Sequence, residues 1–132
     1  LDSHGGLCFF IPKLRNVYRE LGKRYKLPLA LPKHFIFNKT RKMASGSSDS
    51  LIGVHSLKNE ETLENRLMAY DRMLSSLGKG RHYCFSHPSP PTVSIKESLG
   101  DYNIRNNEYA LLLSPEWKNL LKKHSVSLDS FG

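Results

Sequence analysis

The stretch Asn59–Gly78, NEETLENRLMAYDRMLSSLG, carries the clearest secondary-structure signal in the 132-residue chain. Its large apolar side chains recur at the spacing of one helix face, which predicts an α-helix over residues 60–77. They are Leu63, Leu67, Tyr70, Met73, Leu74 and Leu77. Asn59 is the expected N-cap, and the neighbouring glutamates suit the positive end of the helix dipole. Gly78 suits the position that follows the helix.

Prolines predict two more helices. Pro12 suits the first position of a helix over residues 12–26, which ends where Leu27 precedes Pro28. Ser114 and Pro115 predict the start of another helix, which runs to about His124. The first of these helices has a basic stripe and, on another side, an apolar face whose spacing predicts that it packs on the core. That apolar face consists of Leu14, Val17, Tyr18, Leu21 and Tyr25.

Short strands are predicted between the helices. Residues 34–38, 51–57 and 82–86 have strand composition, and residues 87–91 (HPSPP) form an irregular loop because prolines lack backbone donors. A further short strand is predicted at 92–95.

The region before Ser114 is less regular in sequence. Residues 98–107 are polar and turn-like, and residues 108–113 (EYALLL) fit a strand or the start of a helix. This order of elements predicts an α+β fold, with a small, mainly antiparallel sheet and about three helices packed on it.

Length and composition favour one globular domain over residues 1–132. The chain is 39% hydrophobic and 24% charged, and no apolar run is long enough to span a membrane. Residues 1–6 are expected to be flexible or foreign to the domain. Because the chain starts at Leu1, we expect it to be a piece of a larger protein. The low cysteine count (Cys8 and Cys84) fits a reducing compartment, which predicts an intracellular location, nuclear or cytoplasmic.

The positive charge is concentrated in one part of the chain. Residues 1–48 hold ten basic and two acidic side chains, so they carry all of the net charge of +8. Such asymmetry is typical of proteins with a polyanionic partner. The candidate polyanion-binding residues are Arg15, Arg19, Lys23, Arg24, Lys26, Lys33, Lys39, Arg41 and Lys42. Tyr25 and Phe37 lie among them and are candidates for stacking on unpaired bases.

The leading functional hypothesis is therefore a non-catalytic domain that contacts the phosphates of DNA or RNA without reading their sequence. The alternative is a protein-interaction domain whose basic face docks an acidic partner segment or a neighbouring domain. A third possibility is an enzyme fragment whose active site is shared with residues outside this chain.

Candidates for metal or covalent chemistry are sparse. His82, Cys84 and His87 form H-x-C-x2-H, and Cys8 adds another potential zinc ligand, but the paired C-x2-C spacing of zinc ribbons is absent. A nucleophilic pair of Cys84 with His34 or His55 is conceivable. No phosphate-binding loop, serine elbow or zinc-protease motif is present. The sequence thus predicts no cofactor, no metal and no catalytic residue.

Overall fold

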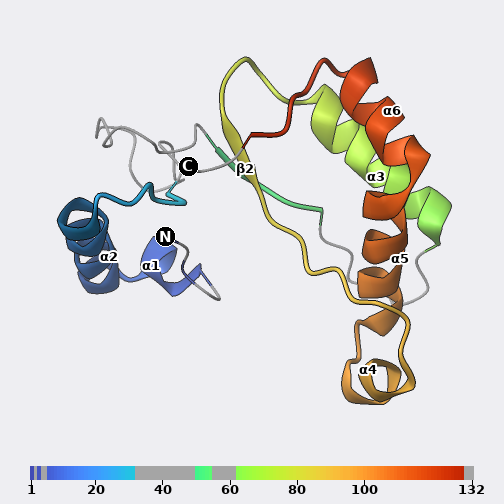
Figure 1. Cartoon of the computed structure of the whole chain (residues 1–132), viewed down its shortest axis with the longest axis horizontal. Coiled ribbons are helices and arrows are strands. Elements are labelled where there is room, and N and C mark those ends of the chain that lie inside the picture. Colours follow the sequence, from blue (N-terminus) through green and yellow to red (C-terminus); the bar gives the residue numbers. More distant parts are fainter. Residues whose placement is uncertain (2, 4–5, 32–49, 55–61, 130–132) are drawn as a thin grey trace. The chain divides into compact units, whose positions relative to one another are not determined.

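The computed structural model describes residues 1, 3, 6–31, 50–54 and 62–129 (Figure 1). The chain divides into two compact units. Unit 1 consists of Leu1–Ile52, Lys79–Cys84 and Asp129–Gly132, and unit 2 of Gly53–Gly78 and Phe85–Leu128. Each unit has its own cluster of buried apolar side chains.

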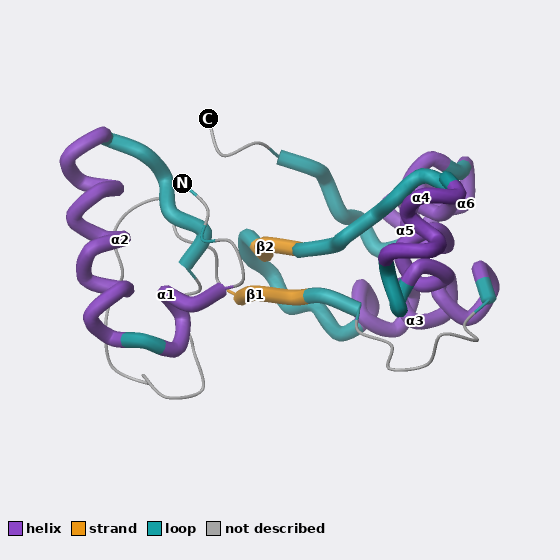
Figure 2. Tube along the Cα trace, turned by 90° about the horizontal axis from the view of Figure 1, so that it is seen from below, coloured by secondary structure: helices purple, strands orange, loops and turns teal. Residues whose placement is uncertain are grey.

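Unit 1 contains two helices and a two-stranded sheet. Helix α1 covers Leu7–Phe10 and helix α2 covers Pro12–Tyr25, with Pro12 at the first position of α2 as predicted. Strands β1 (Ser50–Ile52) and β2 (His82–Cys84) are parallel, with Leu51 opposite Tyr83 (Figure 2, orange). A buried cluster of Cys8, Phe9, Tyr18 and Leu31 forms the core of this unit, and Leu29 and Leu51 pack against it.

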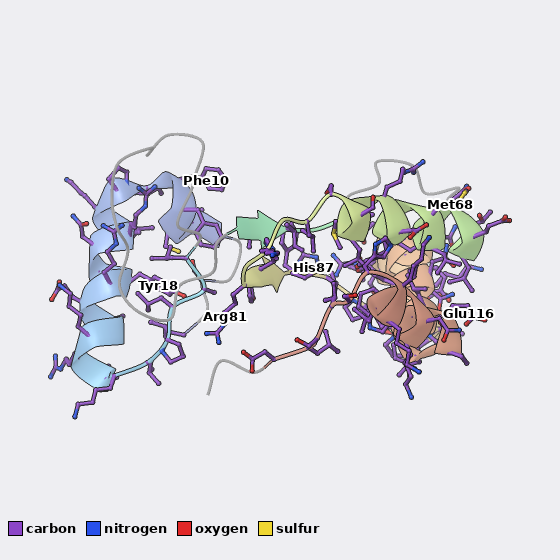
Figure 3. The ribbon with its side chains drawn as sticks, turned by 90° about the horizontal axis from the view of Figure 1, so that it is seen from above. Phe10, Tyr18, Met68, Arg81, His87 and Glu116 are labelled. Carbon is purple, nitrogen blue, oxygen red and sulfur yellow. The ribbon has the colours of Figure 1, made fainter. Side chains whose placement is uncertain are left out.

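Tyr18 connects α2 to the segment that follows it. Its hydroxyl accepts a hydrogen bond from the Ala30 N–H at 3.1 Å and donates to the Leu1 carbonyl. Figure 3 shows the Tyr18 side chain pointing from α2 toward that segment. Gly22, one turn further along α2, is buried, and a Cβ at this position would collide with the side chain of Leu29. The absence of a side chain at Gly22 therefore allows the segment to approach the helix closely.

The predicted apolar face of α2 is buried at one position only. Tyr18 is 6% exposed, whereas Val17 is 56% exposed and Tyr25 is 59% exposed. Leu14 and Leu21 are also exposed. The spacing correctly predicted a helix, but most side chains of its apolar face are exposed.

Unit 2 is a group of helices. Helix α3 covers Leu63–Ser75, α4 Val93–Ser98, α5 Tyr102–Leu113 and α6 Pro115–Lys123. Helix α3 packs against both α5 and α6, and α5 packs against α6 (Figure 1, green and red). The core consists of Tyr70, Leu74, Leu111 and Leu120. The ring of Trp117 meets that of Tyr70 edge to face, with centroids 5.4 Å apart.

Side-chain hydroxyls cap the starts of α3 and α6 in unit 2. The Ser114 hydroxyl accepts from the Trp117 N–H at 3.3 Å, which confirms the predicted start of α6. Helix α3 is capped by Thr62, whose hydroxyl accepts from the Asn65 N–H at 3.1 Å. The predicted N-cap, Asn59, lies outside the described residues. The helix ends at Ser75, two residues before the predicted end.

The predicted fold class is wrong. The described residues form six helices and a two-stranded parallel sheet, not a mainly antiparallel sheet carrying three helices. The main error concerns residues 92–113. Thr92 is an N-cap, accepting from the Ile95 N–H at 3.4 Å, and starts α4 where a strand was expected. The expected turns at 98–107 lie largely in α5, and residues 108–113, which fitted a strand or the start of a helix, form the second half of that helix.

The remaining predicted strands are confirmed only in part. Residues 50–52 and 82–84 are strands, and 87–91 is the irregular loop expected from its prolines. The predicted strand at 34–38 and residues 55–57 lie outside the described residues. Among the described helices, none combines the length and apolar composition needed to cross a membrane.

A partly exposed charged cluster links α3 to α6. Lys123 Nζ donates to both carboxylate oxygens of Asp71 at 2.8 Å, and His124 Nε2 lies 2.6 Å from Asp71 Oδ1. The hydrogen bond from Lys123, followed by that from His124, holds the pKa of Asp71 below its usual value. Ionised Asp71 therefore stabilises the packing of α6 on α3.

We predict that Gly22→Ala destabilises unit 1 by about 1 kcal/mol. Alanine favours a helix by about 1 kcal/mol over glycine, but overpacking at a closed site costs about 1–3 kcal/mol. Urea unfolding of both proteins measures the difference. Gly78→Ala is the matched control, since nothing lies within 4 Å of the Cβ that it adds; its effect should stay within about 0.5 kcal/mol. An equal or greater stability of Gly22→Ala would contradict the close approach of Leu29.

We also predict that Asp71→Asn reduces stability at neutral pH and not in strong acid. Because the folded-state pKa of Asp71 is lowered, its contribution is fully present above the unfolded pKa of about 3.9. The contribution is lost as the pH falls through the folded-state pKa. Urea unfolding midpoints of the two proteins should differ above about pH 5 and converge as the pH falls through the folded-state pKa of Asp71. The unfolding midpoint of Lys123→Met should converge with that of the unaltered protein in the same way. A difference in midpoint that persists in acid would show that ionised Asp71 is not the cause.

Candidate functional site

The best-defined polar site in unit 2 surrounds the loop Phe85–Pro91, which follows β2 along the chain. Loops held on a rigid scaffold carry much of the binding and catalytic chemistry of proteins, and segments that follow parallel strands are a common place for it. His87 is an exposed residue of this loop and is labelled in Figure 3. Its ring meets the ring of Phe85 edge to face, with centroids 6.1 Å apart.

Helix α5 holds this loop through two hydrogen bonds. The His87 N–H donates to Glu108 Oε2 at 2.8 Å, and the Ser89 N–H donates to the Arg105 carbonyl at 3.1 Å. Both acceptors belong to residues one helical turn apart on α5. The loop backbone is therefore fixed on both sides of Pro88, even though His87 itself is exposed.

A buried charged network lies beneath the loop. Glu108 is 4% exposed and accepts a second hydrogen bond, from the Tyr70 hydroxyl to Oε1 at 2.7 Å. The Nη1 of Arg66 lies 3.8 Å from the same oxygen and donates to the Val54 carbonyl at 2.8 Å. Arg66 is fully buried. Buried charges are tolerated when they are paired and hydrogen-bonded, as both are here.

Neither Arg66 nor Glu108 is predicted as a site residue from the sequence. The available signal was their spacing. Arg66, Tyr70 and Leu74 follow one another at intervals of four residues, which places an arginine on the buried face of α3. Glu108 lies three residues before the buried Leu111 on α5. That signal was hidden because residues 108–113 also fit a strand.

Asp101 and Arg105 form an ion pair at the start of α5. The Arg105 Nε donates to Asp101 Oδ1 at 2.8 Å. This hydrogen bond is the main cause of a lowered pKa of the Asp101 carboxyl, and the electrostatic influence of His87 lowers that pKa further. The same hydrogen bond raises the pKa of Arg105. The carboxylate and the guanidinium thus lie on the stretch of α5 whose Arg105 carbonyl also holds the loop, through the Ser89 N–H.

The predicted polyanion-binding residues of α2 belong to unit 1, and several have partners there. Arg15 donates from Nε to the Cys8 carbonyl at 3.2 Å and from Nη2 to the Phe9 carbonyl, which satisfies the end of α1. Lys23 pairs with Glu20 at 2.9 Å. Arg24 lies over the exposed ring of Tyr25, 5.6 Å from its centroid.

Of the other residues predicted to bind a polyanion or to stack on bases, only Arg19 and Lys26 lie in the described part of the chain. Arg19 is half-buried on α2, and Lys26 is exposed at its C-cap with φ of 53°. Lys33, Phe37, Lys39, Arg41 and Lys42 lie outside the described residues. Binding of an anion by any of these side chains stays a prediction.

The zinc candidates are not assembled among the described residues. Cys8 is buried in the core of unit 1, His82 and Cys84 lie on β2, and His87 belongs to unit 2. Within the part of the chain that is described, no three His, Cys, Asp or Glu side chains are grouped so as to hold a metal ion. His34 and His55, the proposed partners of Cys84, lie outside the described residues.

One solved structure with the same fold is that of a proposed cellobiose-phosphate cleavage protein from Enterococcus faecalis V583. It is 19% identical in sequence and superposes with a TM-score of 0.67. The match covers 98% of this chain and 50% of the other, so this chain spans about half the length of that protein. No curated protein sequence matches the chain.

The family model of YdjC-like proteins matches residues 1–123. Together with the shared fold, this match overturns the hypothesis of a nucleic-acid-binding domain and its alternative of a protein-docking domain. The error arose because the charge of residues 1–48 was interpreted without the local partners of Arg15, Lys23 and Arg24. Since the match covers nearly the whole chain, the protein belongs to the YdjC-like family.

Proposed function

We propose that this chain is part of a carbohydrate-processing enzyme that acts on a phosphorylated sugar. The observation that carries the proposal is the shared fold, over 98% of this chain, with a protein named for the cleavage of cellobiose phosphate. Membership of the YdjC-like family supports it. Because the chain spans half of that relative, the activity is proposed for the whole protein of which these residues are a part.

The polar site of unit 2 has the chemistry that such a substrate requires. Cleavage of a sugar derivative needs a group that transfers a proton, and an exposed imidazole is suited to that role near neutral pH. We assign this role to His87, whose backbone is fixed by α5. A carboxylate such as that of Asp101 accepts hydrogen bonds from sugar hydroxyls.

Arg105 is the candidate for binding the phosphate. Its Nε donates to Asp101, and the planar guanidinium carries further N–H groups arranged to bind a phosphate in a bidentate manner. The ion pair with Asp101 also restricts the orientation of the guanidinium. This assignment predicts that the phosphorylated sugar binds more tightly than the same sugar without phosphate.

The test is incubation of the purified whole protein that contains this chain with cellobiose phosphate, followed by chromatography with mass detection of glucose, glucose phosphate and cellobiose. We expect turnover, and we expect His87→Ala to lower kcat by about 10²-fold or more, the usual contribution of a proton-transfer group. His82→Asn, which changes a histidine of β2 in unit 1, is the matched control and should leave kcat unchanged.

Binding is tested separately by thermal unfolding. Cellobiose phosphate at 100 times its Kd should stabilise the fold by about 2.7 kcal/mol, and cellobiose alone should stabilise it less. Arg105→Lys should remove most of this preference, because a lysine cannot bind bidentately. The proposal is wrong if cellobiose phosphate gives neither product nor a higher unfolding temperature.

A further inference from the structure

We propose that Glu108 is a positioning residue, whose buried carboxylate fixes the backbone of the loop at His87 and thereby orients its imidazole. The chemical role of His87 rests on the proposed function, whereas the holding of the loop by Glu108 does not. Glu108 lies on α5, 21 residues from His87 along the chain. Its side chain is 5% exposed and so acts on a substrate only through the loop.

The hydrogen-bond donors of the loop explain why a side chain is needed. In residues 87–91, HPSPP, three of the five residues are prolines without an N–H, so His87 and Ser89 supply the backbone donors. Both donate to α5, Ser89 to the Arg105 carbonyl and His87 to the Glu108 carboxylate. If Glu108 were removed, one of these two attachments would be lost.

The carboxylate is itself held in one orientation. Oε2 accepts from the His87 N–H and Oε1 accepts from the Tyr70 hydroxyl, at 2.8 and 2.7 Å. Both oxygens therefore accept hydrogen bonds, and hydrogen bonds to a carboxylate are stronger than those to a neutral acceptor. Tyr70 is fully buried on α3, so the position of His87 is coupled to the packing of α3 on α5.

Arg66 supplies the opposite charge. Its Nη1 lies 3.8 Å from Glu108 Oε1, and both side chains are almost completely removed from water. A buried ion pair is often no more stabilising than apolar side chains of the same size, so stability alone does not account for it. The need for a hydrogen-bond acceptor at the loop does account for the buried ion pair, because an apolar side chain at position 108 cannot bind the His87 N–H.

The test compares Glu108→Gln with Asp71→Asn. Glutamine keeps the shape of the side chain and one acceptor oxygen but loses the charge. We expect amide hydrogen exchange at His87, followed by NMR, to become about 10-fold faster, because a neutral amide oxygen is a weaker acceptor than a carboxylate. Asp71→Asn is the control, since it removes another carboxylate of unit 2 whose hydrogen bonds join α3 to α6 and do not involve the loop.

Glu108→Asp is a second variant that tests the inference even if Glu108→Gln does not fold. It retains the charge opposite Arg66 but withdraws the carboxylate by one methylene, so it should also accelerate exchange at His87. Exchange at core amides of α3, such as that of Leu74, should stay unchanged in Glu108→Asp. If exchange at His87 is unaffected in the folded variants, Glu108 does not hold the loop and the inference is wrong.

Turnover of cellobiose phosphate separates positioning from a general loss of structure. Glu108→Asp should lower kcat with little change in KM, and it should have no further effect in a His87→Ala background, because it acts through His87. Additive losses would overturn the positioning role. If even the unaltered whole protein gives no turnover, the proposed function fails, and the exchange measurement still decides whether Glu108 holds His87.

Discussion

Unit 2 depends on a constraint that a buried carboxylate imposes on its neighbours. Glu108 has to be matched by donors and by an opposite charge, and these come from two separate parts of the unit: Tyr70 and Arg66 on α3, and the His87 N–H of the loop. The apolar contacts among Leu74, Leu111 and Leu120 tolerate small shifts of the helices. The hydrogen bonds of the Glu108 network form only within a narrow range of donor–acceptor distances. The network therefore fixes how α3, α5 and the loop meet, and the candidate site is built on that arrangement.

The sequence predicted helices correctly where an unambiguous local signal marked the first residue of the helix. Pro12 and the Ser114-Pro115 pair mark helix starts through their own backbone and side-chain chemistry, and both starts are found. Residues 98–113 have no such marker. Their polar first half and the run EYALLL fit several local structures, and the helix is decided by packing of Glu108 and Leu111 against α3. Strand direction likewise depends on a partner 32 residues away, which local patterns do not contain.

The candidate site was harder to predict than the fold. His87 was noticed for its spacing to Cys84, as a metal ligand, whereas the structure relates it to Glu108 and Phe85. The positive charge of residues 1–48 was the most visible feature of the sequence, yet Arg15 satisfies helix-end carbonyls and Arg24 covers an aromatic ring. A count of charges records neither partner, and for this reason it indicated the wrong class of function.

The open apolar stripe of α2 has a consequence for the behaviour of the chain in solution. Leu14, Val17, Leu21 and Tyr25 expose apolar surface on the same helix that carries the basic residues. Mutual repulsion of these positive charges opposes contact between the stripes of two molecules. Added salt shortens the range of that repulsion to about 3 Å at 1 M, while the apolar attraction remains. The colloidal stability of this chain thus rests on charge, and concentrated salt favours its association.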